Sequence, residues 1–384
     1  MEKNNTQSTL LYLMACAIRD IVPFGIAADF AELYSLSKFH SVTAMVATAL
    51  ESGGYLSEEH MDASLVRQWK DAKNKAVRKN ILLDAEREQL LAFFEREGIW
   101  YMPLKGSVLK ELYPKMGMRQ MADNDILFDK GFRQQVRGYM KSRGYKVVAY
   151  GEGIHDTYQK PPVYNFELHI DLVPGYVKPS WSTYYANVKQ RLLKDAGNNC
   201  GYHFSDEDFY IYFIAHAFKH FENGGTGIRN LADIYIFLRS RTWQMEWDYV
   251  YRELEMLGCV DFEVNLRNLS QKLFSEPEMQ LLTERERALL SGLFGAGTYG
   301  TIENSTSKRL HALQPESQPL SAVTKLRYIF IRLFPDAEHM KGYAPVCRKY
   351  PWMIPFARIY RLVKSLFLRG RIIVAELKAI RKTK

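Results

Sequence analysis

The 384-residue sequence predicts an α+β protein in which a mixed sheet core is flanked by N-terminal and C-terminal helical regions. Apolar residues recur with helical spacing through residues 1–97 and again from residue 205, whereas residues 98–180 contain short apolar or alternating runs typical of strands. Hydrophobic residues make up 47% of the chain, which is enough for a substantial core at this length. We therefore expect four regions: an N-terminal helical region (1–97), the sheet core (98–180), a helical domain (181–297), and a linker with a basic helical tail (298–384).

The N-terminal region is predicted to contain three helices. The first carries one apolar stripe, formed by Leu10, Leu11, Met14, Ala17, Ile18 and Ile21. The second is expected over residues 30–52. The third is long and charged, spans residues 64–97 and is expected to stop at Gly98. Its predicted apolar face consists of Ile81, Leu82, Ala85, Leu90 and Phe93 or Phe94.

The core is predicted to contain four strands. The expected strands are residues 99–104, 124–128, 146–150 and 163–173. A short helix over residues 107–113 separates the first two strands, and a helix over residues 130–145 with Gly144 as its cap precedes the third. In the fourth strand an apolar face alternates with a polar face, which carries Asn165, Glu167, His169 and Asp171.

Beyond the core the sequence returns to helical periodicity. Ser205 is expected to cap a helix that runs to about residue 221, and further helices continue to about residue 295. Residues 298–319 are rich in Ser, Thr, Gly and Pro and predict a loop or linker. A basic amphipathic helix is expected from about Pro355. Its stripe includes Ile359, Leu362, Val363, Leu366, Ile373, Leu377 and Ile380.

The net charge of +9 is concentrated in the tail. Residues 320–384 contain 15 Lys or Arg and 3 Asp or Glu, which leaves the rest of the chain slightly acidic. Such a tail could contact nucleic acid or an anionic membrane, although a solvated helical face is the commoner explanation. We expect a cytoplasmic protein without a signal peptide, because the four cysteines lack disulfide or zinc spacing and the sequence contains no apolar run of about 20 residues.

Two aspartates begin the second predicted strand. Asp123 and Asp125 project to the same face of a strand, whereas Asn124 points away. Their carboxylates repel each other unless a cation lies between them, and Mg²⁺ prefers such oxygen ligands. An isolated Asp-x-Asp is more often a solvated pair at a strand end, so the neighbouring residues decide the interpretation.

Two neighbouring features favour a site. Gly106 and Ser107 lie between a strand and a short helix, where backbone amides suit a phosphate and Lys105 adds a positive charge. An ordinary turn is the alternative. Glu167, or less favourably Asp171, offers a third carboxylate, and three carboxylates on adjacent strands can hold two metal ions. A hydrogen-bonded edge-strand glutamate is the alternative there.

These motifs follow one another in a familiar order. Gly-Ser, Asp-x-Asp and a later acidic strand resemble the superfamily of DNA polymerase beta-like nucleotidyltransferases. The "LKG" at residues 104–106, Tyr113, Arg119, "DNDILF" and "FELH" resemble the bacterial uncharacterised nucleotidyltransferase family. The similarity extends to "HAFKHF…GIRNLADIYIFL" and "YPWMIPFARIYR". The gap of 16 residues from Ser107 to Asp123 is longer than in the best-known superfamily members.

The resemblance implies a nucleotidyltransferase fold and a Mg²⁺-dependent enzyme. It would move a nucleoside monophosphate from an NTP such as ATP to an unidentified acceptor and release pyrophosphate. Asp123, Asp125 and Glu167 would bind two Mg²⁺ ions, and Glu167 could deprotonate the acceptor. The substrate-binding residues would be Lys105, Gly106, Ser107, Arg119 and His169.

Several alternatives stay open at this point. Arg119 could pair with Asp123 or Asp125 in the absence of substrate, and the fold could serve a non-catalytic nucleotide- or nucleic-acid-binding module. His216 and His220 are four residues apart on a predicted helix, but the sequence lacks the Glu of His-Glu-x-x-His, so we expect a substrate-facing or core pair rather than zinc. Arg229 and Asp233 are expected to form a salt bridge or else to line the cleft. P-loop and Gly-x-Ser-x-Gly motifs are absent from the sequence.

Overall fold

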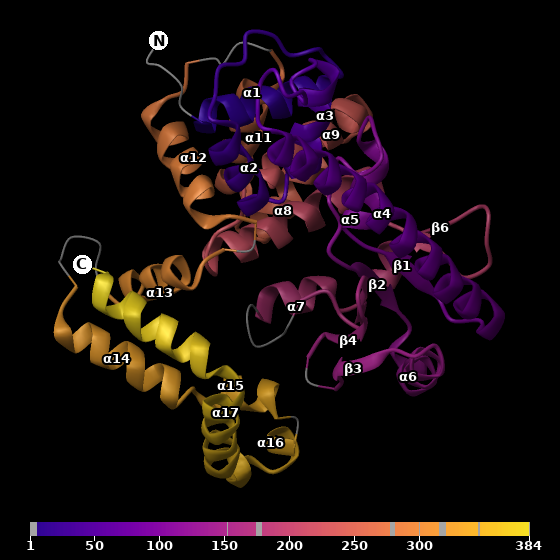
Figure 1. Cartoon of the computed structure of the whole chain (residues 1–384). Helices are drawn as coiled ribbons and strands as arrows, with labels where there is room; N and C mark the ends of the chain where they lie inside the picture. The colour runs from indigo at the N-terminus through magenta and orange to yellow at the C-terminus, as the bar shows by residue number, and fades with distance from the viewer. Residues whose placement is uncertain are drawn as a thin grey trace.

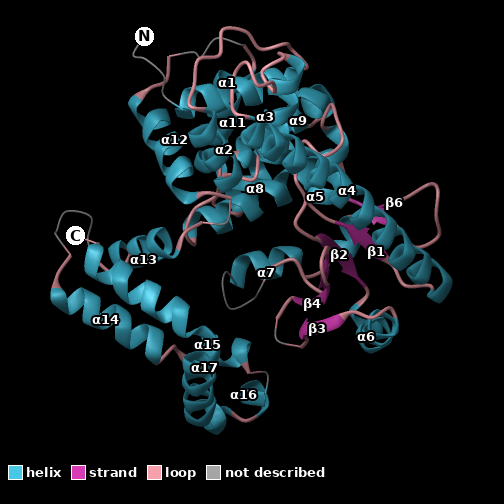
Figure 2. Ribbon diagram, in the orientation of Figure 1, coloured by secondary structure: helices cyan, strands magenta, loops and turns pink. Residues whose placement is uncertain are grey.

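The computed structural model describes residues 6–151, 153–173, 179–276, 281–298, 300–314, 320–344 and 346–383. It confirms the α+β prediction, because a five-stranded mixed sheet lies among helices from both ends of the chain (Figure 1; Figure 2). Among the described residues, no helix combines the length and the apolar character needed to cross a membrane.

Four helices precede the sheet. They are α1 (Thr6–Arg19), α2 (Phe30–Phe39), α3 (Thr43–Ser52) and α4 (Ala63–Glu97). The single helix expected over residues 30–52 is wrong, because the chain breaks at Ser41, whose φ of 53° lies in the left-handed region. Gly98 ends α4 with φ 68°, as predicted. Ile81 was assigned to the apolar face of α4 but is exposed, whereas Leu83 is buried.

The sheet contains five strands in the order β1-β2-β5-β4-β3. The strands are β1 (Tyr101–Pro103), β2 (Asn124–Phe128), β3 (Lys146–Ala149), β4 (His155–Lys160) and β5 (Tyr164–His169). β2 and β5 are parallel, and the other neighbouring pairs are antiparallel. β4 was not predicted, because "HDTYQK" is almost entirely polar and only Tyr158 and Asp156 are buried.

Short elements connect these strands. They are α5 (Gly106–Leu109), the 3-10 turn η1 (Lys110–Leu112), the 3-10 turn η2 (Lys130–Phe132) and α6 (Arg133–Ser142). Gly144 follows α6 with φ 82°, in agreement with its predicted role as a stop. The C-terminal part of α4, with Phe93 and Phe94, packs together with Val136 of α6 and with Phe166 of β5. One face of the sheet is therefore covered by α4 and α6.

The opposite face is turned toward a helical bundle. The elements that follow the sheet are α7 (Pro179–Tyr185), the 3-10 turn η3 (Val188–Arg191), the hairpin β6 (Leu193–Lys194) and β7 (Tyr202–His203), α8 (Asp206–Glu222), α9 (Arg229–Arg241), the 3-10 turn η4 (Thr242–Gln244), α10 (Trp247–Met256), α11 (Val260–Phe274) and α12 (Glu284–Ala296). The Ser205 side chain accepts a hydrogen bond from the Asp208 amide and caps α8, as predicted. α1 packs against α3, α9 and α11, so the N-terminal helices and the later helices share one hydrophobic core.

The remaining helices form a separate group on one side of the molecule (Figure 1). They are α13 (Ile302–His311), α14 (Ala322–Leu333), α15 (Ala337–Tyr343), α16 (Val346–Lys349), the 3-10 turn η5 (Pro351–Met353) and α17 (Ile354–Lys382). α17 begins next to Pro355, as expected. The predicted loop over residues 298–319 is wrong in part, because α13 lies within it and packs against α17. Residues 299 and 315–319 of that segment lie outside the described residues.

Candidate active site

Two parallel strands bring the predicted carboxylates together. In the β2·β5 ladder, Asp125 is paired in register with Glu167. Asp123 immediately precedes β2, so its side chain shares the Asp125 face by strand alternation. Asn124 lies between Asp123 and Asp125 in the sequence and belongs to the other face. Its side-chain amide donates a hydrogen bond to the Leu83 carbonyl of α4 at 2.9 Å. The acidic face is therefore the one turned toward the helical bundle.

Of the three carboxylates, Asp125 is the one whose negative charge is stabilised by direct contacts. Its Oδ1 accepts a hydrogen bond from Lys105 Nζ at 3.1 Å and from His169 Nε2 at 2.9 Å. Burial alone would raise the pKa of Asp125, but Lys105 and His169 outweigh burial and hold the pKa below its usual range. Asp125 is thus ionised at neutral pH.

Asp123 and Glu167 are in the opposite situation. Burial raises the pKa of Asp123 to about 7, and the carboxylates of Asp125 and Glu167 act in the same direction. Burial and Asp125 likewise raise the pKa of Glu167. Within the described part of the chain, the Asp123 side chain makes no hydrogen bond or ion pair. The three carboxylates thus carry more negative charge than Lys105 compensates, and their hard oxygen donors fit a divalent cation such as Mg²⁺.

Two histidines extend the carboxylate group. His155 of β4, His169 and Glu167 place one ligand atom each within 4.8 Å of the others. Both His155 Nε2 and His169 Nε2 lie 3.8 Å from Glu167 Oε2. Burial lowers the pKa of His169 to about 4, so a neutral imidazole donates Nε2–H to Asp125. His155 was not among the predicted site residues, because β4 was not predicted as a strand.

The Gly-Ser turn is held by contacts within the protein. Lys105 has φ 45°, in the left-handed region, and burial alone would lower its pKa, yet Asp125 raises that pKa above its usual range. The Ser107 hydroxyl is buried and donates to the Leu104 carbonyl at 2.8 Å. A Cβ on Gly106 would lie 2.6 Å from Arg119 Nη1 and 2.9 Å from Met121 Cε. Glycine is therefore required at this position because the Arg119 side chain packs against it.

Arg119 is not hydrogen-bonded to any of the three candidate carboxylates but pairs with Asp233. Its Nε and Nη2 donate to the two oxygens of Asp233 in α9, at 2.7 and 3.0 Å, and Tyr113 Oη donates to the same carboxylate at 2.7 Å. The alternative pairing of Arg119 with Asp123 or Asp125 is thus not adopted. The expected Arg229–Asp233 pair is also not among the ion pairs of the described residues, since Arg229 donates to the Gln120 carbonyl at 3.2 Å. The packing of α9 against η1 brings Asp233 to Arg119 instead.

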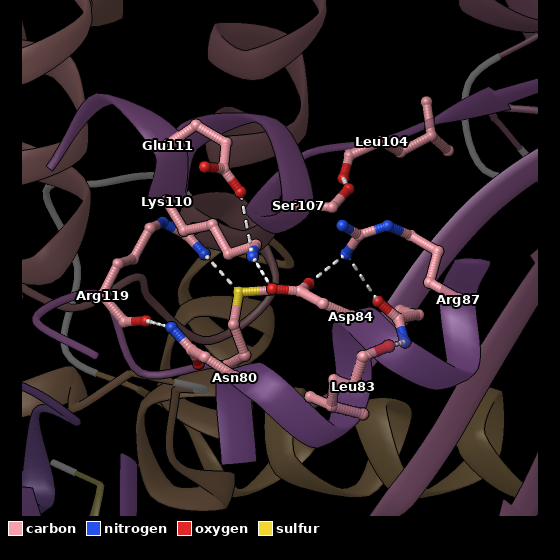
Figure 3. Close-up of polar contacts among 11 residues, drawn as sticks. Asn80, Leu83, Asp84, Arg87, Leu104, Ser107, Lys110, Glu111 and Arg119 are labelled. Carbon is pink, nitrogen blue, oxygen red and sulfur yellow. Dashed lines mark hydrogen bonds and ion pairs between the residues drawn. The ribbon is translucent and has the colours of Figure 1, made fainter. Parts of the chain in front are cut away.

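Polar residues of α4 contact the start of β2 and the segment after the Gly-Ser turn (Figure 3). Arg87 Nη1 donates to Asp84 Oδ1 at 2.6 Å and to Asn124 Oδ1 at 3.3 Å. The second oxygen of Asp84 pairs with Lys110, which follows the Gly-Ser turn. Figure 3 also shows Asn80, whose amide contacts the Arg119 carbonyl at 3.4 Å. α4 therefore positions both the start of β2 and the Gly-Ser turn, a role that its sequence did not reveal.

One face of α8 lies opposite the carboxylates. Tyr212, His216 and Lys219 are spaced four and three residues apart, so they share this face. Burial raises the pKa of Tyr212 to about 12, with Lys105, Asp125 and Glu167 as its electrostatic neighbours. Burial and Lys105 lower the pKa of Lys219 to about 8, against the opposing effect of Asp125 and Glu167. The Lys219 ammonium group forms no hydrogen bond or ion pair with another described residue.

His216 and His220 form a hydrogen-bonded pair. Their Nε2 atoms are 3.2 Å apart, which requires one ring to donate and the other to accept. Burial lowers the pKa of both rings, to about 4 for His220. The pair is thus neutral at physiological pH. Among the described residues these two histidines belong to no group of three metal-ligating side chains.

One of three comparisons with known proteins finds a match. A family model described as "Uncharacterised nucleotidyltransferase" matches residues 27–275, which run from just before α2 to the end of α11. The match includes the Gly-Ser turn, the three carboxylates, Arg119, Asp233 and the whole of α8. No curated protein and no solved structure matches the chain. The family match covers most of the sequence and all of the site, and the chain therefore belongs to the uncharacterised nucleotidyltransferase family.

Proposed function

We propose that this protein transfers a nucleoside monophosphate from an NTP to an acceptor, in a Mg²⁺-dependent reaction that releases pyrophosphate. The observation that carries the proposal is the in-register pairing of Asp125 with Glu167 on parallel strands, with Asp123 on the same face. A group of one buried and two half-buried carboxylates with so little compensating charge is costly unless it binds cations. Membership of a nucleotidyltransferase family supports the reaction class.

Asp123, Asp125 and Glu167 are the residues that would hold Mg²⁺, and two ions can share such a set. Bound Mg²⁺ would supply positive charge to the triphosphate and to the departing pyrophosphate. Asp125 Oδ1 is already used by Lys105 and His169, so its Oδ2 is the oxygen available for a metal ion. Lys105 and His169 thereby fix the orientation of this carboxylate.

Glu167 is suited to accept the proton of the acceptor. Burial and Asp125 raise the pKa of Glu167 in the metal-free protein, which strengthens it as a base, whereas a metal ion bound to it would act in the opposite direction. An acceptor hydroxyl would attack the α-phosphorus, its proton would pass to Glu167, and the bond to pyrophosphate would break. His155 and His169 lie 3.8 Å from the Glu167 carboxylate and restrict its position.

The triphosphate would be bound between the Gly-Ser turn and α8. Gly106, Ser107 and Lys105 would contact it from the sheet, and Lys219 offers an ammonium group from α8 without a competing ion pair in the described structure. Arg119 is committed to Asp233, so it acts on substrate through the Gly106 turn that it supports. We place the reaction in the cytoplasm, where NTPs and the four free thiols of this chain are both expected.

The proposal is tested by NTP binding in the presence and absence of Mg²⁺. The wild type should bind NTP with Mg²⁺ and much more weakly with EDTA. Asp123→Asn combined with Asp125→Asn should lose the metal-dependent part, by on the order of tenfold or more. Asp171→Asn is the matched control, because Asp171 is an exposed carboxylate just beyond β5. Equal Mg²⁺-dependent binding by the wild type and the double variant would refute the metal assignment.

A second measurement separates an enzyme from a binding module. NTP labelled at the α-phosphorus is incubated with the protein and a cell extract, and transfer of label to any acceptor is followed. Transfer that requires Asp123 and Asp125 supports catalysis. Tight, metal-dependent binding without transfer to any component would instead favour the non-catalytic module.

A further inference from the structure

Large apolar side chains are exposed mainly in the C-terminal helices. Of the 30 exposed large hydrophobic side chains in the described residues, 18 lie in residues 320–383. This segment is about one sixth of the chain, and it lies beyond the stretch matched by the family. Single exposed hydrophobic residues are normal on protein surfaces, whereas a concentration of them marks an interaction surface.

The two sides of α17 differ in a way that is unusual for a helix of a water-soluble protein. The side that faces the neighbouring helices is held largely by polar contacts. Arg358 Nε donates to the Pro335 carbonyl at 2.9 Å, and Arg361 Nη2 donates to the Leu333 carbonyl at 3.0 Å. Glu376 accepts hydrogen bonds from Tyr328 at 2.6 Å and from Arg332 at 2.8 Å, both in α14.

The opposite side of α17 carries the large apolar residues. Phe367 is 85% exposed and Leu366 is 67% exposed. The exposed stripe consists of Trp352 in η5 and of residues that share one face of α17 at helical spacing: Phe356, Ile359, Tyr360, Val363, Leu366, Phe367, Val374 and Leu377. We call this set the α17 stripe. Its residues are exposed although α17 packs against α13 and α14, beside which it lies in Figure 1.

Charge identifies the kind of partner. Residues 320–384 carry 15 basic and 3 acidic side chains, and Lys364 and Lys378 flank the α17 stripe on the helix surface. Nucleic acid would match the positive charge but would leave the aliphatic and aromatic stripe uncovered. The surface of an anionic bilayer matches both, because acyl chains accept the apolar side chains while lipid phosphates attract the lysines. Trp352 and Tyr360 suit the region between headgroups and acyl chains.

We propose that the α17 stripe docks the protein onto the surface of an anionic phospholipid bilayer. The helix lies along the membrane plane, with the stripe inserted at the headgroup level and with α13 to α15 on the side away from the lipid. The carboxylates of the candidate active site belong to β2 and β5 and take no part in this contact.

The test uses the full chain and vesicle flotation. Wild-type protein is mixed with phosphatidylcholine vesicles, with or without about 30% phosphatidylserine. It should float with the anionic vesicles, and at least about tenfold less with neutral ones. Val363→Glu with Phe367→Glu should reduce the bound fraction about tenfold or more, because both substitutions place acids on the α17 stripe. Lys364→Glu with Lys378→Glu should weaken binding to anionic vesicles and make the remaining binding less sensitive to salt, because fewer positive charges then contact the lipid phosphates.

The matched control is Trp243→Glu with Met256→Glu. These two side chains are as exposed as the α17 stripe but lie outside the C-terminal helices, so vesicle binding should be unchanged. Circular dichroism checks that each variant is folded. Two outcomes overturn the proposal: wild-type protein that stays out of anionic vesicles, or stripe variants that float as well as the wild type. Self-association in the absence of lipid that only the stripe variants lose would assign the surface to a second copy of the chain instead.

Discussion

Asp233 shows how a single buried charge can organise residues from distant parts of the sequence. Its two carboxylate oxygens are taken by Arg119 and Tyr113, and all three side chains are buried. Arg119 in turn sets the space available at Gly106, directly before Ser107. The Arg119–Asp233 pair therefore supports the Gly-Ser turn, and we propose that Arg119 influences phosphate binding through this turn.

We expect Asp233→Asn to destabilise the protein by about 3–5 kcal/mol, because it leaves the buried Arg119 guanidinium without a counter-charge. Urea unfolding at pH 7 measures this loss. Asp71→Asn, at an exposed position in the middle of α4, should change the free energy of unfolding by less than about 0.5 kcal/mol. If Asp233→Asn lowered the free energy of unfolding as little as Asp71→Asn does, the structural role assigned to Asp233 would be contradicted.

Lys219 is the residue of α8 that the proposed reaction uses most directly. Lys219→Met should lower NTP affinity about tenfold or more, since it removes a positive charge from a partly buried site. Stability should change little, because Lys219 has no ion-pair partner among the described residues. Isothermal titration with Mg²⁺ and NTP compares it with Lys141→Met on the exposed side of α6. Unaltered affinity in Lys219→Met would remove α8 from the triphosphate site.

At the scale of elements, the break between α2 and α3 places a histidine in the core. His40 is fully buried, neither of its ring nitrogens has a hydrogen-bond partner in the described structure, and its ring lies 5.2 Å from that of Phe294 in α12. Burial lowers the pKa of His40 to about 4. This neutral ring thus joins the N-terminal helices to α12.

The depressed pKa makes stability depend on pH. Below about pH 6.5 the unfolded chain binds a proton at His40 that the folded protein excludes, so stability falls as the pH drops from about 6.5 to about 4. The His40 contribution to this loss is about 3 kcal/mol. His40→Phe should remove that part of the pH dependence, as measured by urea unfolding at pH 7, 5.5 and 4.5. His60→Phe, at an exposed position, serves as the control, and an unchanged slope in His40→Phe would contradict the assignment.

At the scale of the whole molecule, the N-terminal helices and the later helices share one hydrophobic core. Leu10 and Met14 of α1 belong to the same hydrophobic cluster as Leu266 and Leu269 of α11, although some 250 residues separate them. Among the described residues of the C-terminal helices, the cluster that they form by themselves is a small one around Leu310, Tyr328 and Ile380. The N-terminal helices are therefore needed to complete the bundle that faces the active site, whereas α14 to α17 are not.

Two truncations test this organisation. A chain without residues 1–52 should lack a cooperative thermal transition, because α9 and α11 lose the surface that covers them. A chain without residues 320–384 should keep its cooperative transition. Circular dichroism and intrinsic fluorescence follow both. Cooperative unfolding of the first truncated chain at a wild-type temperature would show that the bundle folds without α1 to α3.

Local rules of the chain predicted much of the candidate site. The alternation of a strand puts Asp123 and Asp125 on one face, and the polar face of "FELH" carries Glu167 and His169 next to each other in space. These relations depend on backbone geometry over a few residues, so they can be read from spacing. The strand that contains His155 could not be predicted from spacing, because its polar sequence has no periodic pattern of apolar residues.

The sequence by itself determined the α+β class, the family, the order of the motifs and the positive charge of the tail. Only the tertiary structure decided the partners of the charged groups: Arg119 with Asp233, Lys105 with Asp125, and α8 opposite the carboxylates. It also decided which side of α17 is exposed. The physical reason is that secondary structure and composition follow from local interactions, whereas ion pairs and exposed faces depend on how elements distant in the sequence pack.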